Sequence, residues 1–404
     1  WSPVQIMNTS VDKQFDGKFS VENRYDYLNL NTCRFLWKQV KFPTATDASN
    51  TTAQVLKQGE VQGSDVAAHS AGVLDIKTTI LPDADALFLT AIDRYGHELW
   101  RWTFPVNKLN QANEVLSPLS NKVTSTETEN ELTVKAKNHT FIFSKKDGQL
   151  KGVSVNNRKI SFANGPRFIG ARRADRSLDQ FYNHDDEKAK EKDRTYSEFP
   201  DAAVFTKLDV KEDGGNLIVT ANYKLGNLDK AQWTINPNGE AVLDYTYNFS
   251  GVVDLMGICF DYPEDQVISK RWLGAGPYRV WQNRIHGTQY DVWENDYNDP
   301  IPGETFTYPE FKGYFGSVSW MNIRTKEGTI SLTNETPDAY IGVYQPRDGR
   351  DRLLYTLPES GISVLNVIPP VRNKVNSTDL CGPSSQPKWV NGPQSGRIIF
   401  RFME

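Results

Sequence analysis

The sequence predicts an all-β protein with more than one domain. Many short segments alternate apolar and polar residues with a period of two, which is typical of half-buried β-strands. Tyr, Phe and Trp make up 12% of the residues, and 28 Gly and 21 Pro separate the segments. Periodicity of the helical kind is scarce. At 404 residues the chain is too long for one ordinary domain, so we expect two or three, each with its own core.

Residues 1–112 are predicted to form a small β-sandwich. The strands that we expect there are Phe19–Leu30, Cys33–Val40, Leu74–Ile80, Ala86–Asp93 and Glu98–Val106. The alternation of Cys33, Phe35 and Trp37 directs one face of its strand inward, and we expect Trp37 to fill the core. The turn between the last two strands is expected at Arg94–His97. Short strands at this spacing are typical of an immunoglobulin-like sandwich, although the paired-cysteine pattern is lacking.

A polar connector with Pro118 follows, and we place the linker at residues 113–122. Residues 123–404 are predicted to form one large antiparallel β-sandwich, which is too long for an immunoglobulin domain. Gly and Asn tolerate positive φ in hairpin turns. Such turns are expected at Asp147-Gly148, Asn156-Asn157 and Asn238-Gly239.

The charge pattern excludes some classes of partner. The formal net charge is −4, so bulk electrostatics predict binding neither to nucleic acid nor to an anionic membrane. No apolar run approaches the roughly 20 residues that cross a bilayer. The interval Arg176–Pro200 is dense in charge, and we expect a solvated loop with a helical turn over Asp185–Lys192.

The cysteines and histidines indicate neither a metal site nor a cofactor. Cys33, Cys259 and Cys381 lie far apart and are expected to be buried free thiols. No two histidines have the spacing of a zinc site. His97 and His139 are predicted in turns at the surface, which leaves His184 and His286 as the histidines to test. No nucleophile elbow, phosphate-binding loop or dinucleotide fingerprint occurs.

One stretch, Trp272–Asp299, combines three tryptophans with several charged residues. The tryptophans are Trp272, Trp281 and Trp293. Flat rings beside fixed carboxylates and guanidinium groups suit a carbohydrate, because rings cover its C–H faces and charged groups bind its hydroxyls. The same composition also suits a large β-sheet with buried aromatic residues. Glycosidases need two facing carboxylates, for which residue type alone offers Asp291, Glu294, Asp296, Glu304 and Glu310.

Several motifs together resemble one enzyme family. WLGAGPYRVWQNR (272–284), YDVWENDYND (290–299) and YPEFKGYFGSVSWMNI (308–323) resemble the C-terminal β-sandwich of family-two glycoside hydrolases of the β-galactosidase type. Residues 147–160 and 165–177 are similar to the opening of that domain, a galactose-mutarotase-like supersandwich. GKFSVENRYDYLNLNTCRFLWKQV resembles the immunoglobulin-like domain that follows the catalytic barrel in such enzymes.

The resemblance implies a chain that is not catalytic by itself. In the family the two catalytic glutamates lie on a (β/α)₈ barrel, which needs about 250 residues of alternating strands and helices, and no such tract occurs here. We therefore assign no catalytic residue and expect a partner domain or subunit that carries the barrel. The assembled enzyme would be a retaining hydrolase of β-linked galactosides or related glycans. Whether the chain also forms a homo-oligomer stays an open question at this point.

The resemblance assigns one site residue, Trp389. In the family a Trp near the C-terminus lies on a polar loop and stacks on the sugar, and DLCGPSSQPKWV (379–390) occupies that place here. The chain departs from the family pattern, because Ser-Gln-Pro-Lys precedes the tryptophan. Chain order and the resemblance also favour a structural and interdomain role for Trp272–Asp299 over a role as a sugar-binding surface.

Two other functions stay open at this point. One is a free-standing carbohydrate-binding module that uses the surface of Trp272–Asp299. The other is an independent sugar epimerase or polysaccharide lyase on the large sandwich, with His286 and either Glu294 or Glu310 as its site. The chain begins at Trp1 with neither an initiator Met nor a basic segment, so we expect a mature or truncated end rather than a signal peptide. We expect a periplasmic or extracellular protein if its source is a glycan-degrading bacterium, and otherwise a cytoplasmic one.

Overall fold

The structure, a computed structural model, describes residues 2–47, 52–106, 122–173, 196–296, 313–343, 358, 360–370 and 382–404. The regular elements in these ranges are β-strands and a few single-turn 3₁₀ helices, which confirms the all-β prediction. None of the described helices is long and apolar enough to cross a membrane. The chain divides into two compact units: Trp1–Asn113 with Gln289–Val292, and Glu114–Thr288 with Trp293–Glu404.

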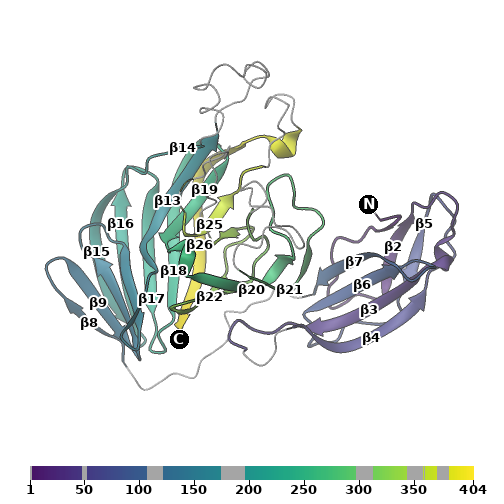
Figure 1. Ribbon diagram of the computed structural model, residues 1–404, viewed down its shortest axis with the longest axis horizontal. Helices are drawn as coiled ribbons and strands as arrows, with labels where there is room; N and C mark the ends of the chain where they lie inside the picture. Colours follow the sequence, from purple (N-terminus) through teal and green to yellow (C-terminus); the bar gives the residue numbers. More distant parts are fainter. Residues whose placement is uncertain are drawn as a thin grey trace, which may run out of the picture. The chain divides into compact units, whose positions relative to one another are not determined.

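The first unit is a sandwich of two antiparallel sheets. The three-stranded sheet has the order β1 (Val4–Ile6), β2 (Lys18–Asn23) and β5 (Ser70–Asp75). The four-stranded sheet has the order β4 (Gln54–Gln62), β3 (Arg34–Lys41), β6 (Ala86–Ile92) and β7 (Glu98–Pro105) (Figure 1). Both sheets contribute to one core, where the rings of Phe19 and Phe104 lie 5.1 Å apart. Trp37 is 6% exposed in this core, as predicted.

Two predicted strands of this unit are shorter in the structure. The strand predicted over Phe19–Leu30 ends at Asn23, whose side-chain amide donates to the carbonyl groups of Leu28 and Val66 and closes a loop. The strand predicted over Leu74–Ile80 ends at Asp75, whose carboxylate accepts from the amide of Lys77. Polar side chains that bond the backbone compete with a strand ladder, and hydrophobic alternation does not reveal them.

The second unit contains two larger antiparallel sheets. One sheet has the order β24 (Tyr340–Gly342), β25 (Ile362–Val367), β19 (Leu255–Asp261), β13 (Ala163–Arg173), β11 (Leu150–Val155), β10 (His139–Ser144), β9 (Glu131–Ala136) and β8 (Thr124–Glu127); β12 (Arg158–Ile160) pairs with β11, and β14 (Tyr196–Glu198) with β13. The other sheet has the order β15 (Val204–Asp213), β16 (Asn216–Lys224), β17 (Leu228–Ile235), β18 (Ala241–Val253), β26 (Lys388–Met403), β23 (Gly328–Asn334), β22 (Trp320–Thr325), β20 (Val267–Gly276) and β21 (Gln289–Asp296).

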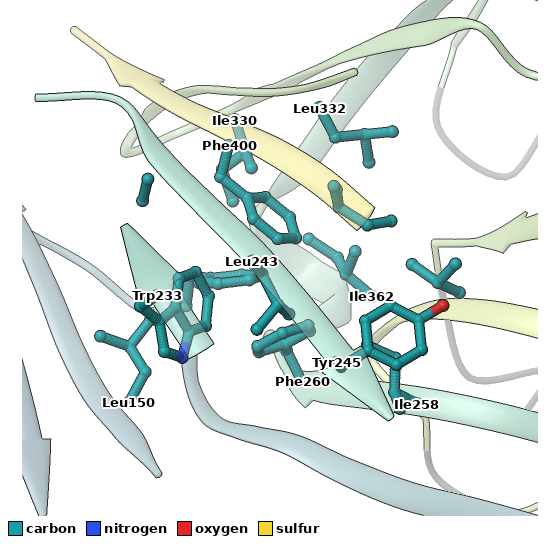
Figure 2. Close-up of a cluster of buried hydrophobic side chains, with 14 of the residues drawn as sticks. Leu150, Trp233, Leu243, Tyr245, Ile258, Phe260, Ile330, Leu332, Ile362 and Phe400 are labelled. Atoms are coloured by element: carbon teal, nitrogen blue, oxygen red, sulfur yellow. The ribbon is translucent and has the colours of Figure 1, made fainter. Parts of the chain in front are cut away.

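The core of the second unit lies between these sheets, which confirms the large antiparallel sandwich. Aromatic rings from both sheets meet there: Phe260 of β19 lies 6.0 Å from Trp233 and 5.5 Å from Phe400 (Figure 2). All three side chains are fully buried. Side chains of this size dominate the energetics of a core, because each buries about 150–250 Å².

The predicted hairpin turns are present. Gly148 has φ +73°, Asn156 and Asn157 have φ +47° and +64°, and Gly239 has φ +87°. Each of these left-handed residues lets an antiparallel strand return to its neighbour. The turn at Arg94–His97 is confirmed as well, because the amide of Asp93 donates to the carbonyl of His97 at 2.9 Å.

The burial of one histidine, His139, differs from the prediction. His139 is the first residue of β10 and is only 9% exposed, whereas the sequence placed it at the surface. Its ring Nε2 lies 2.8 Å from the carbonyl oxygen of Phe402, a residue 263 positions away that the local sequence could not reveal. Burial lowers the pKa of His139.

Cys33 and Cys259 are buried free thiols, as predicted. Cys381, residues 113–121 of the linker and the turn at Asp185–Lys192 lie outside the described residues.

Candidate functional site

The tryptophan side chains of the stretch Trp272–Asp299 are buried or partly buried in the fold. Trp272 is fully buried on β20 and donates through Nε1 to the carbonyl of Ala275 at 2.9 Å. Trp281 is buried in a cluster with Ile169 and Cys259. Trp293 packs against the main core and donates to Gly274 at 3.2 Å. These three tryptophans therefore serve the architecture of the fold, whereas Tyr278 of the same stretch is 47% exposed.

Part of the same stretch belongs to the first compact unit. There the carboxylate of Asp291 pairs with Arg101 at 3.0 Å, and both side chains are largely buried. Burial raises the pKa of Asp291, against the effect of the guanidinium. The ring of Tyr290 meets Phe42 edge to face at 5.7 Å. Asp291 is thus engaged in a structural ion pair.

Trp389 differs from these tryptophans because its side chain is open to solvent. It lies at the start of β26, is 70% exposed and pairs with Val252 of β18. A 3₁₀ turn, Pro383–Ser385, comes immediately before it. An indole of this size is usually buried, so an exposed one on a sheet strand is a candidate contact for a flat ligand.

The turn before Trp389 is held by residues of the tryptophan-rich stretch. The side-chain amide of Gln282 donates to the carbonyl groups of Ser384 at 3.0 Å and Gln386 at 2.8 Å. The amide of Asn283 donates to the hydroxyl of Ser385 at 2.8 Å. Sequence reasoning missed both anchors, because they join residues about a hundred positions apart. They connect Trp389 to the segment that follows Trp281.

The alternative site of His286, Glu294 and Glu310 is only partly described. His286 and Glu294 are both exposed, and no hydrogen bond joins them within the described part of the chain. Glu310 lies outside the described residues, as does His184. Across the described ranges, no group of three or more His, Cys, Asp and Glu side chains is placed to hold a metal ion.

A pocket of about 400 Å³ lies elsewhere in the second unit. Its walls come from the turn after β10, from β13, from residues 198–205 and from β16. Arg167 lines it, forms an ion pair with Asp261 at 2.6 Å and donates to the sulfur of Cys259 at 3.6 Å. Burial raises the pKa of the Cys259 thiol to about 11, so this sulfur stays protonated. Sequence reasoning missed this pocket, and the one signal near it is a segment rich in Pro, Arg and Asp.

Curated proteins and solved structures were compared with this chain. A search of curated proteins returns no match. A galactose 1-epimerase from Lactobacillus acidophilus is similar in structure with a TM-score of 0.36 and 10% identity, over 70% of this chain and 98% of its own. A putative mutarotase from Salmonella typhimurium has a TM-score of 0.33 and 9% identity, over 71% of this chain and 96% of its own. Neither likeness bears on what this chain binds or catalyses.

The strongest comparison is with a protein family. The model of the beta galactosidase small chain family matches residues 135–368, which is more than half of the chain and, apart from Gln289–Val292, lies within the second unit. This range contains the buried tryptophans Trp272 and Trp281, the anchor residue Gln282 and the pocket. The chain therefore belongs to the beta galactosidase small chain family.

Proposed function

We propose that this chain is the non-catalytic part of a β-galactosidase-type retaining glycoside hydrolase. Family membership implies a carbohydrate-related role and a partnership with a catalytic domain or subunit. In our proposal that partner carries a (β/α)₈ barrel with the catalytic glutamates, and this chain braces the barrel and completes its substrate cleft. In this proposal residues 1–112 are an immunoglobulin-like domain, residues 113–122 a linker and residues 123–404 the large sandwich.

One observation carries the proposal, namely the exposed and anchored indole of Trp389. Its side chain is 70% exposed, yet the backbone beneath it is fixed by β18 and the turn before it is fixed by Gln282. A ring held in this way loses little conformational freedom when it stacks on the apolar face of a galactoside. The substrate in our proposal is a β-linked galactoside or a related glycan.

The expected effect of Trp389 follows from the area that a sugar would cover. Stacking one sugar face on an indole removes roughly 50 Å² of apolar surface from water, which at about 25 cal/mol per Å² amounts to about 1.3 kcal/mol, or roughly tenfold in affinity. Trp389→Ala in the assembled enzyme should therefore raise KM about tenfold. Trp389→Phe, which keeps a smaller ring, should raise it less.

The experiment combines the purified chain with a barrel-bearing polypeptide of the same enzyme type. We expect no hydrolysis of a nitrophenyl β-galactoside by the chain alone, and hydrolysis once the two are mixed. Hydrolysis by the chain alone, or a barrel polypeptide that gains nothing from the chain, would refute the proposal. An unchanged KM in Trp389→Ala would refute the stacking role of this residue alone.

A further inference from the structure

The pocket lined by Arg167 is a site distinct from Trp389, which is not among its lining residues. At about 400 Å³ it lies in the lower part of the range typical of pockets for small ligands, roughly 300–1,000 Å³. This size suits one or two sugar residues better than a longer glycan. The charges and rings on its walls determine which ligand chemistry it fits.

The walls of this pocket are fixed before any ligand binds. Gly148 turns the hairpin after β10 with φ +73°, and a Cβ there would lie 2.7 Å from the ring of Phe205 and from Ala221. The hydroxyl of Tyr223 donates to the carbonyl of Asp147 at 2.9 Å, which joins the hairpin to β16. A preformed pocket binds a ligand without the cost of ordering its own walls.

Asp201 fixes the opposite wall. Its carboxylate accepts from the amides of Ala203 at 3.1 Å and Asn227 at 2.9 Å. The amide of Phe199 donates to the carbonyl of Gly170 at 2.8 Å, so the segment between β14 and β15 is tied to β13. This wall therefore presents the ring of Phe199 from a backbone that is held at both ends.

The charges on the walls favour a neutral ligand. Two cationic residues, Lys146 and Arg167, face three acidic ones, Asp147, Glu198 and Asp201, so the formal sum is −1. Arg167 is already paired with Asp261, and Asp147 with Lys151 at 2.7 Å. An anionic ligand such as phosphate would find no surplus of positive charge here.

The remaining wall groups suit a polyhydroxylated ligand. Phe199, Phe205 and Tyr223 supply three aromatic rings, and those of Phe205 and Tyr223 meet edge to face at 5.9 Å. The side chain of Arg167 lines the pocket and is 36% exposed, so it is accessible to a ligand hydroxyl as a hydrogen-bond donor.

We propose that this pocket binds a neutral mono- or disaccharide, in addition to any sugar contact at Trp389. Aromatic faces would cover the C–H surface of the sugar. The carboxylates would accept hydrogen bonds from its hydroxyl groups, and Arg167 would donate a hydrogen bond to a hydroxyl oxygen. This site belongs to the second unit alone, so it should operate in the isolated chain without the catalytic partner.

The experiment titrates galactose, lactose and inorganic phosphate into the purified chain and follows binding by calorimetry. We expect saturable binding of a neutral sugar in the millimolar range and none of phosphate. Phe205→Ala and Arg167→Gln should each weaken sugar binding about tenfold or more. Trp389→Ala should leave it unchanged, as should Arg397→Gln, a control that removes an exposed guanidinium paired with Asp244.

Each other result would overturn the proposal. Absence of saturable sugar binding, tighter binding of phosphate than of sugar, or loss of binding in Trp389→Ala rather than in Arg167→Gln would each refute it. If Arg167→Gln fails to fold, as circular dichroism would show, Phe205→Ala and Glu198→Gln answer the question, because Glu198 is exposed. The KM of Trp389→Ala in the assembled enzyme tests the proposed function separately.

Discussion

Replacing Gln282 by leucine should release the turn that precedes Trp389. The side-chain amide makes two hydrogen bonds to this turn, at 3.0 Å to Ser384 and 2.8 Å to Gln386. Each such bond contributes about 1 kcal/mol net, so their loss should destabilise the anchored turn by about 2 kcal/mol. At 1.4 kcal/mol per factor of ten, the ratio of anchored to released turn should fall by roughly 30-fold.

Hydrogen exchange on the isolated chain measures this ratio directly. The amides of Ser385 and Gln386 donate within the turn, to the carbonyl groups of Gly382 and Pro383. In Gln282→Leu these amides should exchange up to about 30-fold faster, while amides of the central strands keep their rates. Gln266→Leu is the matched control, because within the described part of the chain the side-chain amide of Gln266 donates only to its exposed neighbour Asp265.

The reasoning would be refuted if the two turn amides exchanged at the same rate in Gln282→Leu and in the unmodified chain. A second test uses the assembled enzyme of the proposed function. If Gln282 acts by positioning Trp389, then Gln282→Leu should raise KM in the unmodified background and have no further effect in Trp389→Ala. Equal effects in both backgrounds would show that Gln282 acts independently of Trp389.

Three further predictions concern stability and reactivity in the second unit. The Cys259 thiol, with a pKa of about 11, should be about 0.1% thiolate at pH 8, so mass-spectrometric mapping should find it unmodified by a thiol reagent until the chain is unfolded. Burial lowers the pKa of His139 below its ordinary value of 6.5, so the unfolded chain binds more protons in that window. The free energy of unfolding should therefore fall as pH decreases below about 6.5, and His139→Gln should lack this component in denaturant titrations. Gly148→Ala should lower the free energy of unfolding by about 1–3 kcal/mol, through strain at φ +73° and the clash with Phe205.

The glycine variant has a matched control, and each of the three predictions has a result that would contradict it. Gly215 also has a positive φ, +91°, but a Cβ there would have nothing within 4 Å, so Gly215→Ala isolates the strain from the clash. Equal destabilisation in the two glycine variants would contradict the crowding argument at Gly148. Modification of Cys259 in the folded chain, or an identical pH dependence in His139→Gln, would contradict the burial of these two side chains.

The sequence predicted the fold where local chemistry decides it. Period-two alternation located β3, β6 and β7 to within a residue or two, and left-handed Asn and Gly located the hairpin turns. It missed β4, because that strand is an edge strand whose side chains are mostly exposed, so burial imposes no alternation on it. It also overran β2, which a single side-chain amide, that of Asn23, brings to an end.

The candidate sites depend on contacts between residues far apart in the sequence, which the sequence alone does not reveal. The position of Trp389 came from a resemblance, whereas its anchor depends on Gln282, 107 residues earlier. The pocket depends on Arg167 meeting Asp261 and on Tyr223 meeting Asp147, which are pairs 94 and 76 residues apart. Such pairings follow from strand order in the sheets, and the hydrophobic pattern fixes the strands without fixing their order.

The tryptophan-rich stretch is connected physically to both candidate sites. The ring of Trp281 is buried against Ile169 and Cys259, which also line the pocket. The next residue, Gln282, holds the turn that leads to Trp389. A buried indole in a well-packed cluster has little freedom to move, so it restrains the next residue and the two pocket-lining residues of its cluster together. In our proposal this stretch therefore serves carbohydrate recognition by positioning two other surfaces, because its tryptophan side chains are buried or packed against a core.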